Sequence, residues 1–392
     1  MQNKHKLRNL INNLKPHFSE GGKFSFLYST FCAFECFFFV PDKITTKGTH
    51  IKDAIDSKRT MITVVIALMP CLLFGIYNTG LQHFLSIGEQ KTFFEIVYYG
   101  FLKVFPLIIV SYIVGLTIEF SMAQIRKHEV NEGFLVTGMI IPLIVPVNIP
   151  LWMLALATAF AVIIGKEIFG GTGYNILNPA LTARVFLFFA FPSYMAGDKV
   201  WIADLAKCEN VIDGFSGETL LSQAITNGCN LVNGMGEQIG IKEMFIGNIP
   251  GCVGETSVIA ILLGAIFLLV SGVACWRIML SVLIGGISMS VFFNILGLSP
   301  IMQIPWYEHL MLGGFAFGMV FMASDPVTAS QTNIGKYIYG FLIGLLAILI
   351  REANPAYPEG MMLAILIMNV FAPLIDYIIV EINIKKRLKR LT

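Results

Sequence analysis

Long apolar segments with few charges recur along this sequence of 392 residues and limit the folds that it can adopt. A helix needs about 20 such residues to cross the hydrocarbon layer of a membrane. Only 13% of the residues are charged, against roughly 25% in a typical soluble protein. We therefore predict an all-α integral membrane protein with about ten transmembrane helices. The predicted spans lie at about 60–77, 97–123, 133–146, 151–169, 180–196, 256–275, 278–297, 309–324, 337–351 and 361–380.

Charge, cysteine spacing and the start of the chain argue against several other classes. Basic residues lie near span ends instead of in one patch, so the net charge of +2 gives no sign of nucleic-acid binding. The seven cysteines have no spacing that suits zinc or an iron–sulfur cluster, so we predict free thiols and no metal site. Residues 1–25 are polar and basic, unlike a signal peptide. The aromatic run at 26–40 is too short to span, and we expect an interfacial helix there.

The charges between the spans predict the orientation of the chain. Ten spans place both termini on one side, and the basic residues concentrate there, which makes that side cytoplasmic. The polar segment 197–254 is then external, and its seven acidic residues against three lysines agree. We expect a cytoplasmic N-terminal segment at 1–58, a first five-helix repeat at 59–196, the external loop at 197–254, a second five-helix repeat at 255–381 and a basic cytoplasmic tail at 382–392.

Glycine and proline recur at matching places in the two halves. The set Gly133-Phe134, Gly138 and Pro146 returns as Gly314-Phe315, Gly318 and Pro326, and Asn-Pro-Ala occurs at both 178–180 and 354–356. Because five is an odd number of spans, the two repeats must run in opposite directions through the membrane. The third span has only about 13 residues before its proline, too few to cross. We expect broken helices that line a central site, the alternative being simple kinks between packed helices.

Two acidic residues lie in or beside predicted spans, where an ionised carboxylate is energetically unfavourable. Glu119 is predicted about 10 Å inside the cytoplasmic end of the second span, where a carboxylate needs a partner or a function unless it snorkels to the interface. Asp325 precedes a proline at a helix break. It either coordinates a cation together with freed carbonyls or caps the next helix, with help from Thr328 and Ser330. His128 and His309 are isolated, and we expect them at the interface.

The stretch GGTGYNILNPALTAR at 170–184 combines flexible glycines with two amide side chains. The amides of Asn175 and Asn178 offer hydrogen-bond donors and acceptors of the kind that bind the polar edge of a heteroaromatic ring. The alternative is a helix-breaking turn that binds nothing. The stretch is neither G-x-G-x-x-G after a strand nor a Walker loop, so no nucleotide fold follows from it.

A small-residue, polar stretch stands out in the external loop. The sequence VIDGFSGETLLSQ at 211–223 contains Thr219, framed by Asp213, Ser216 and Gly217. Taken alone, this pattern is compatible with any surface turn.

Five runs in the same order along the chain closely resemble the B-subunit family of the sodium-translocating NADH:quinone oxidoreductases. The runs are RKHEVNEGF (126–134), GKEIFGGTGYNILNPAL (165–181), FIGNIPG (245–251), GGFAFGMVFMASDPV (313–327) and NPAYPEGMMLAIL (354–366). The resemblance extends from the basic N-terminal segment to the tail, and it implies a helical bundle similar to that of the urea transporters.

The resemblance implies a covalent FMN. In this family a flavin transferase attaches FMN through its phosphate to the last threonine of a D-x-x-S-G-A-T motif. Asp213, Ser216, Gly217 and Thr219 match the motif, so Thr219 is the expected anchor. Glu218 stands where the family has alanine, and its carboxylate adds like-charge repulsion beside the incoming phosphate.

The resemblance also implies a non-covalent riboflavin, a quinone site and a sodium path. Asn175 and Asn178 are the expected riboflavin contacts. The family's Gly-Gly-x-x-Glu quinone motif matches at Gly115 and Glu119, with Leu116 replacing the second glycine. The quinone is ubiquinone or menaquinone. Carboxylates expected to serve sodium are Glu119, Asp325 and Glu359.

On this interpretation the chain is a translocase subunit that is active only within a six-subunit complex with subunits A, C, D, E and F. Electrons pass from FMN on Thr219 through riboflavin to quinone, coupled to Na⁺ export. The expected location is the bacterial inner membrane, with multiple passes, both termini cytoplasmic and the FMN loop periplasmic. One alternative is the D-type flavoprotein subunit of the related Rnf complex, although the extension KGTHIKDAIDSKRTM at 47–61 favours the quinone oxidoreductase. The other is a flavin-free solute channel on a urea-transporter-like fold.

Overall fold

The computed structural model describes residues 13–18, 28, 31, 48–49, 57–126, 133–208, 210–354 and 359–390. Within these ranges the regular structure is helical, apart from one isolated β-bridge between Val232 and Gln238. Among the described residues, five helices are long and apolar enough to cross a membrane: α3 (Ser57–Ile87), α4 (Phe93–Arg126), α11 (Trp276–Leu296), α14 (Asn333–Ala353) and α15 (Gly360–Leu388). The prediction of an all-α membrane protein is confirmed at this level. The predicted interfacial helix at 26–40 lies almost entirely outside the described residues.

The remaining apolar segments form shorter helices. They are α5 (Phe134–Ile144), α6 (Leu151–Val162), α7 (Pro179–Ala190) and α10 (Val258–Val270). The helix α6 continues as a π-helix, η2 (Ile163–Glu167). The prediction that the third span is too short to cross agrees with α5, whose 11 residues are about 16 Å long.

The predicted eighth span, 309–324, is wrong as a single helix. The chain forms α12 (Trp306–Met311), then α13 (Phe315–Phe317), which continues as the π-helix η5 (Gly318–Met322). The break falls at Gly313, whose φ of 63° is left-handed and ends a right-handed helix.

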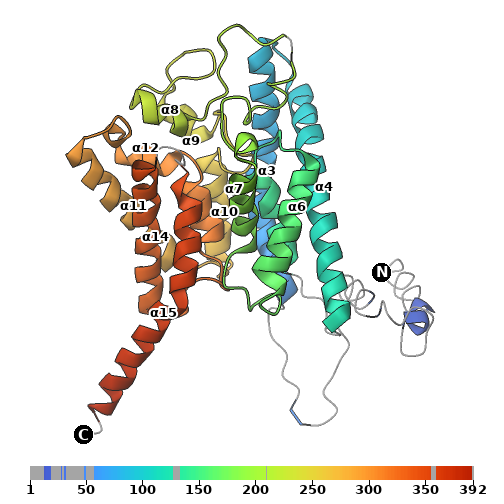
Figure 1. The fold of residues 1–392 in the computed structure, drawn as a ribbon, viewed down its shortest axis with the longest axis vertical. Helices are drawn as coiled ribbons and strands as arrows, with labels where there is room; N and C mark the ends of the chain where they lie inside the picture. The colour runs from blue at the N-terminus through green and yellow to red at the C-terminus, as the bar shows by residue number, and fades with distance from the viewer. Residues whose placement is uncertain are drawn as a thin grey trace.

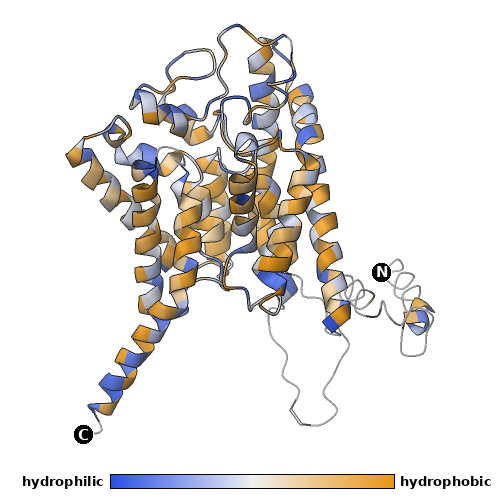
Figure 2. Ribbon diagram, in the orientation of Figure 1, coloured by the Kyte–Doolittle hydropathy of each residue, from blue (hydrophilic) through white to orange (hydrophobic). Residues whose placement is uncertain are grey.

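The helices stand side by side with the segment 197–254 gathered at one end (Figure 1). The start of α3 and the end of α15 lie toward one end of the bundle. The segment 197–254, with α8 (Leu220–Asn227) and α9 (Ile241–Ile246), lies at the opposite end. Hydrophobic residues dominate the middle of the bundle, and hydrophilic residues are more frequent toward its two ends (Figure 2). This distribution suits a protein whose centre faces lipid and whose ends face water.

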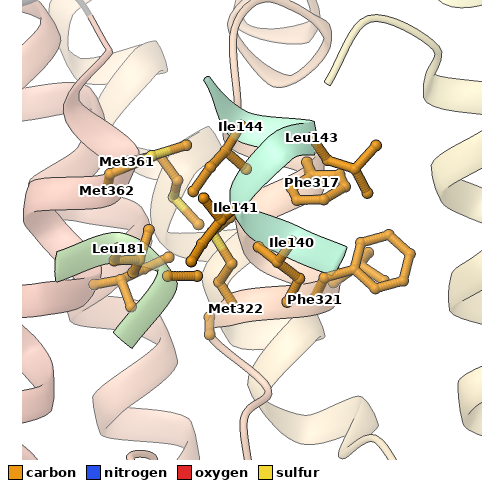
Figure 3. Packing of buried hydrophobic residues seen from close by; sticks show 14 of the residues in the cluster. Ile140, Ile141, Leu143, Ile144, Leu181, Phe317, Phe321, Met322, Met361 and Met362 are labelled. Carbon is orange, nitrogen blue, oxygen red and sulfur yellow. The ribbon is translucent and has the colours of Figure 1, made fainter. Parts of the chain in front are cut away.

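Two short helical segments cross in the buried centre (Figure 3). Leu143 of α5 and Phe317 of α13 both flank Gly254. Ile140, which precedes Leu143 in α5, and Phe321, which follows Phe317, both line one pocket. The chain therefore runs through α5 in the direction opposite to α13 and η5. Because protein surrounds these segments, their ends inside the bundle are shielded from lipid.

The start of each short segment packs a phenylalanine onto a glycine of a long helix. A Cβ on Gly115 of α4 would lie 1.8 Å from the ring of Phe134, and a Cβ on Gly286 of α11 would lie 2.5 Å from the ring of Phe315. The matching dipeptides Gly133-Phe134 and Gly314-Phe315 thus make the same kind of contact in the two halves.

Candidate functional sites

One pocket lies where the start of α3, the start of α5 and the turn after η5 meet. Its empty volume is about 830 Å³, which includes its opening to solvent. The lining is mostly apolar, and its polar members are Thr60, Thr137, Lys166, Thr172, Asn175, Asn178, Ser324 and Asp325. Three of these residues, the two asparagines and Asp325, were predicted as site residues from the sequence. We call this pocket the inner pocket.

The glycine-rich turn before α7 brings the two asparagines to the inner pocket. Gly170, Gly171 and Gly173 all have positive φ, which lets the chain reverse after η2. Asn178 is the N-cap of α7, and its Oδ1 accepts a hydrogen bond of 3.0 Å from the backbone N–H of Ala180. The Asn175 Nδ2 donates to the Leu177 carbonyl at 3.1 Å. The turn is therefore well ordered, and both amides also line a pocket.

Asp325 organises the turn that follows η5. Its Oδ1 accepts from the Val327 N–H at 3.1 Å, and its Oδ2 accepts from the Thr328 hydroxyl at 3.0 Å. Thr328 therefore bonds to Asp325 itself, whereas Ser330 donates to Asp376 at 2.6 Å. The N-cap of α14 is Thr332, so Asp325 does not cap that helix.

Glu119 is buried and paired. Its side chain is 5% exposed, and its Oε1 accepts from the Nζ of Lys166, which is 3% exposed. The partner that an intramembrane carboxylate requires is thus present, and snorkelling is excluded by the burial of both groups. The second oxygen, Oε2, is buried without a hydrogen-bond partner. No local pattern pointed to Lys166 as the partner, because the two residues are 47 positions apart on different helices.

The neighbouring Glu167 belongs to a separate pair at the same end of the bundle. Its Oε2 accepts from Arg126 Nη1 at 3.2 Å, and its carbonyl accepts from Arg126 Nη2 at 2.5 Å. These bonds tie the end of α4 to η2. Together with the contact of Gly115 with Phe134 and the pair of Glu119 with Lys166, they hold the predicted quinone residues against α5 and η2.

Thr219 is the N-cap of helix α8 in the polar segment 197–254. It is half-buried, and its Oγ1 accepts a hydrogen bond of 3.3 Å from the Ser222 N–H as the N-cap. Gly217 is required for close approach, because a Cβ there would lie 2.4 Å from the Asp198 carbonyl oxygen. The Ser216 Oγ accepts from the Glu218 N–H at 3.3 Å, while Asp213 is exposed.

A buried ionic cluster lies next to Thr219. A small second pocket is lined by Thr219, Cys252, Glu255 and Glu359, among others. Arg184 of α7 donates to Glu255 at 2.6 Å and also contacts Glu359. Possible ligand atoms of Cys252, Glu255 and Glu359 lie within 4.8 Å of one another, but the guanidinium of Arg184 already bridges the two carboxylates. Sequence reasoning singled out Glu359 and missed its two charged neighbours.

The expectation for His309 is wrong. Its side chain is fully buried, with Nε2 3.5 Å from Oε1 of Glu352, because α12 packs inside the fold instead of lying at the interface. His128 lies outside the described residues. The described cysteines, Cys71, Cys208, Cys229, Cys252 and Cys275, are free thiols.

These features define a helical membrane protein with a mostly apolar pocket, buried ion pairs between helices and a threonine-capped helix in its large loop. The chain belongs to the NQR2, RnfD, RnfE family, whose model matches residues 44–385. It is 46% identical to a protein of Chromohalobacter salexigens and 45% identical to proteins of Ectopseudomonas mendocina and Klebsiella pneumoniae. All three relatives are named as the B subunit of the Na(+)-translocating NADH-quinone reductase. The matches cover 98% of this chain and 96%, 99% and 99% of the three relatives.

Proposed function

We propose that this chain is the membrane subunit of a Na⁺-translocating NADH:quinone oxidoreductase. It passes electrons from an FMN held covalently on Thr219, through riboflavin, to quinone, and couples this transfer to Na⁺ export. The relatives that it matches over nearly their whole length carry the name of such a subunit. The observation that carries the flavin assignment is the position of the Thr219 hydroxyl.

The geometry around Thr219 supports an FMN phosphoester. Its oxygen lies at the N-terminus of α8, where the backbone N–H groups of the first turn and the helix dipole favour a phosphate. The side chain is half-buried, so the hydroxyl is within reach of a flavin transferase. The carboxylate of Glu218 accepts from the Ser222 hydroxyl, an interaction that moderates its repulsion of the phosphate. Asp213, Ser216 and Gly217 complete the matching motif.

The lining of the inner pocket suits a riboflavin ring. Apolar side chains such as Ile140 and Phe321 suit the faces of a heteroaromatic ring, and the Asn175 and Asn178 amides suit its polar edge. Bound there, riboflavin would supply the electron carrier between the outer FMN and quinone.

Quinone and sodium are assigned to neighbouring groups. Gly115 and Glu119 form the quinone region, where Phe134 fills the space beside the glycine. Of the two sodium candidates besides Glu119, Asp325 is the better supported, since no Lys or Arg pairs with it among the described residues. Glu359 contacts Arg184, which lowers its attraction for a cation.

We further propose two inverted five-helix repeats in an arrangement like that of the urea transporters. The opposite directions of α5 and of α13 with η5 support this, as do the paired contacts of Phe134 with Gly115 and of Phe315 with Gly286. The proposed location is the bacterial inner membrane, with both termini cytoplasmic and the Thr219 loop periplasmic. The position of that loop at the end opposite to the start of α3 and the end of α15 supports this orientation.

The proposed partners are subunits A, C, D, E and F and a flavin transferase. The sequence has no dinucleotide fingerprint, so the other subunits must supply electrons from NADH. The isolated chain should therefore bind flavin without oxidising NADH.

The first test is mass spectrometry of the loop peptide after co-expression with the flavin transferase. We expect the mass of FMN on Thr219 in the wild type and its loss in Thr219→Ala. Thr226→Ala is the matched control, because Thr226 lies in the same helix and should leave the adduct intact. Wild-type chain without any covalent flavin would refute the redox function and favour a solute channel. An adduct that persists in Thr219→Ala would show that FMN is attached to another residue, with Ser216 the next candidate.

A further inference from the structure

The pair of Glu119 and Lys166 is an incomplete ion pair in the interior. A buried carboxylate usually has all its oxygens hydrogen-bonded, and a second oxygen without a partner needs an explanation such as a bound ion or water. Glu119 Oε2 is such an oxygen. The Glu119 carboxylate therefore retains capacity for a further oxygen-seeking cation.

Lys166 links the Glu119 carboxylate to the inner pocket. It lies in the π-helix η2, an irregularity that is common at functional sites. Its side chain also helps line the inner pocket. A lysine carries a compact charge on a flexible stem of four carbons, so a short movement of the stem exchanges one neighbour for another. The alternative position for the ammonium is the pocket, whose wall includes Asp325.

The surrounding charges leave Glu119 dependent on one cation. Arg126, at the end of α4, binds Glu167. The oxygens of Asp325 accept from Val327 and Thr328. Among the described residues, Lys166 is thus the one basic side chain that is paired with Glu119. Removing its charge without replacement would leave an isolated buried carboxylate, which is strongly unfavourable.

We propose that Lys166 is a tethered cation that competes with Na⁺ for the Glu119 carboxylate. Na⁺ binds the two carboxylate oxygens as the ammonium withdraws toward the inner pocket, and the reverse exchange releases Na⁺. The charge beside Glu119 is the same before and after the exchange. Lys166 is in this sense a positioning residue that sets the affinity for Na⁺. The inference rests on the proposed function, because it takes Na⁺ as the transported ion.

The experiment uses the purified whole complex and two substitutions with opposite expected effects. Lys166→Met removes the competing charge, so the Na⁺ concentration for half-maximal ²²Na⁺ binding should fall about fivefold or more, as for a typical coupling between sites. Lys166→Arg keeps a charge that binds a carboxylate with two parallel hydrogen bonds, so the same concentration should rise. Half-saturation of Na⁺-stimulated quinone reduction should shift in the same directions.

Two controls separate competition from general damage. Lys336→Met removes a lysine of α14 that is not part of the pair and should leave the half-saturating Na⁺ concentration unchanged. In a Glu119→Gln background, Lys166→Met should cause no further shift, because the contested carboxylate is already gone.

Several results would overturn the proposal. An unchanged or increased half-saturating concentration in Lys166→Met, in complexes with normal subunit content and flavin, excludes competition. If Lys166→Met does not assemble, an unchanged or decreased half-saturating Na⁺ concentration in Lys166→Arg excludes competition equally. A different result would contradict the proposed function itself. In that case the wild-type complex would lack covalent FMN or would lack Na⁺-stimulated quinone reduction.

Discussion

At the scale of single residues, glycines decide how closely the helices of this protein approach. Gly115 of α4 receives the ring of Phe134, and Gly286 of α11 receives the ring of Phe315. Each phenylalanine begins a short helical segment that ends inside the bundle. The glycines therefore fix where those segments start, and through them the position of the inner pocket.

We predict that Gly115→Ala destabilises the protein. The added methyl group would lie 1.8 Å from the Phe134 ring, so the ring or α5 must shift, at a cost of about 1–3 kcal/mol for an overpacked interior. The measurement is the thermal unfolding temperature of the chain in detergent. Gly165→Ala is the control, since its Cβ would meet Thr182 at 3.4 Å, an ordinary contact. Equal unfolding temperatures for Gly115→Ala and wild type would contradict the tight packing.

At the scale of elements, the polar segment 197–254 is held to the bundle by a clamp of polar contacts around Asp204. Its carboxylate accepts from the Tyr99 hydroxyl at 2.7 Å and pairs with Lys103, both on α4. Its N–H donates to Asn148 Oδ1 at 2.9 Å, and the neighbouring Ala203 carbonyl lies 2.8 Å from His83 Nδ1. The first part of the loop is thereby attached to α3, to α4 and to the connection between α5 and α6.

The clamp should weaken in acid. Burial opposes the ionisation of Asp204, but the hydrogen bonds from Lys103 and Tyr99 and the nearby lysine charges lower its pKa below the usual value. A carboxylate with a depressed pKa stabilises the fold above its unfolded pKa of about 3.9 and loses that effect as the pH falls through its folded pKa. We expect protection of residues 199–208 from hydrogen exchange to persist at neutral pH and to decrease below about pH 4.

We predict that Asp204→Asn reduces this protection already at neutral pH, because the amide cannot attract Lys103 as the carboxylate does. Hydrogen exchange followed by mass spectrometry of the loop peptides measures the effect. Asp198→Asn changes an exposed aspartate of the same loop and should leave the protection unchanged. Wild-type protection in Asp204→Asn would show that the backbone contacts alone hold the loop.

At the scale of the whole molecule, Arg184 joins segments that are far apart in the chain. It belongs to α7 and pairs with Glu255 before α10 and with Glu359 before α15. Arg351 of α14 donates nearby to the carbonyls of His309 at 2.6 Å and Leu312 at 3.1 Å. Arg184 thus connects the two halves of the chain, and Arg351 connects α14 to the end of α12, both next to the pocket that Thr219 lines.

We predict that Arg184→Met is strongly destabilising. It leaves two carboxylates without their shared cation, and breaking a buried pair from one side costs about 3–5 kcal/mol. The yield of monodisperse protein in detergent and its unfolding temperature should both fall. Adding Glu255→Gln should recover part of the loss, because one uncompensated charge is removed. Arg277→Met, at the α11 end where Arg277 contacts Asn333, should have little effect, and an equally large loss there would contradict the argument.

The sequence by itself determined the membrane class, the all-helical secondary structure, the short third segment and the family. Each depends on local composition or on motifs that are contiguous in the chain, and hydropathy directly reports how a segment partitions into lipid. The tertiary structure decided which charges meet. Glu119 and Lys166 are 47 residues apart, and Arg184 and Glu255 are 71 residues apart, so no local pattern pairs them. The burial of His309 and the bond of Ser330 to Asp376 were likewise fixed by packing between helices. The low dielectric of the interior makes each ion pair necessary, but only the fold brings its two members together.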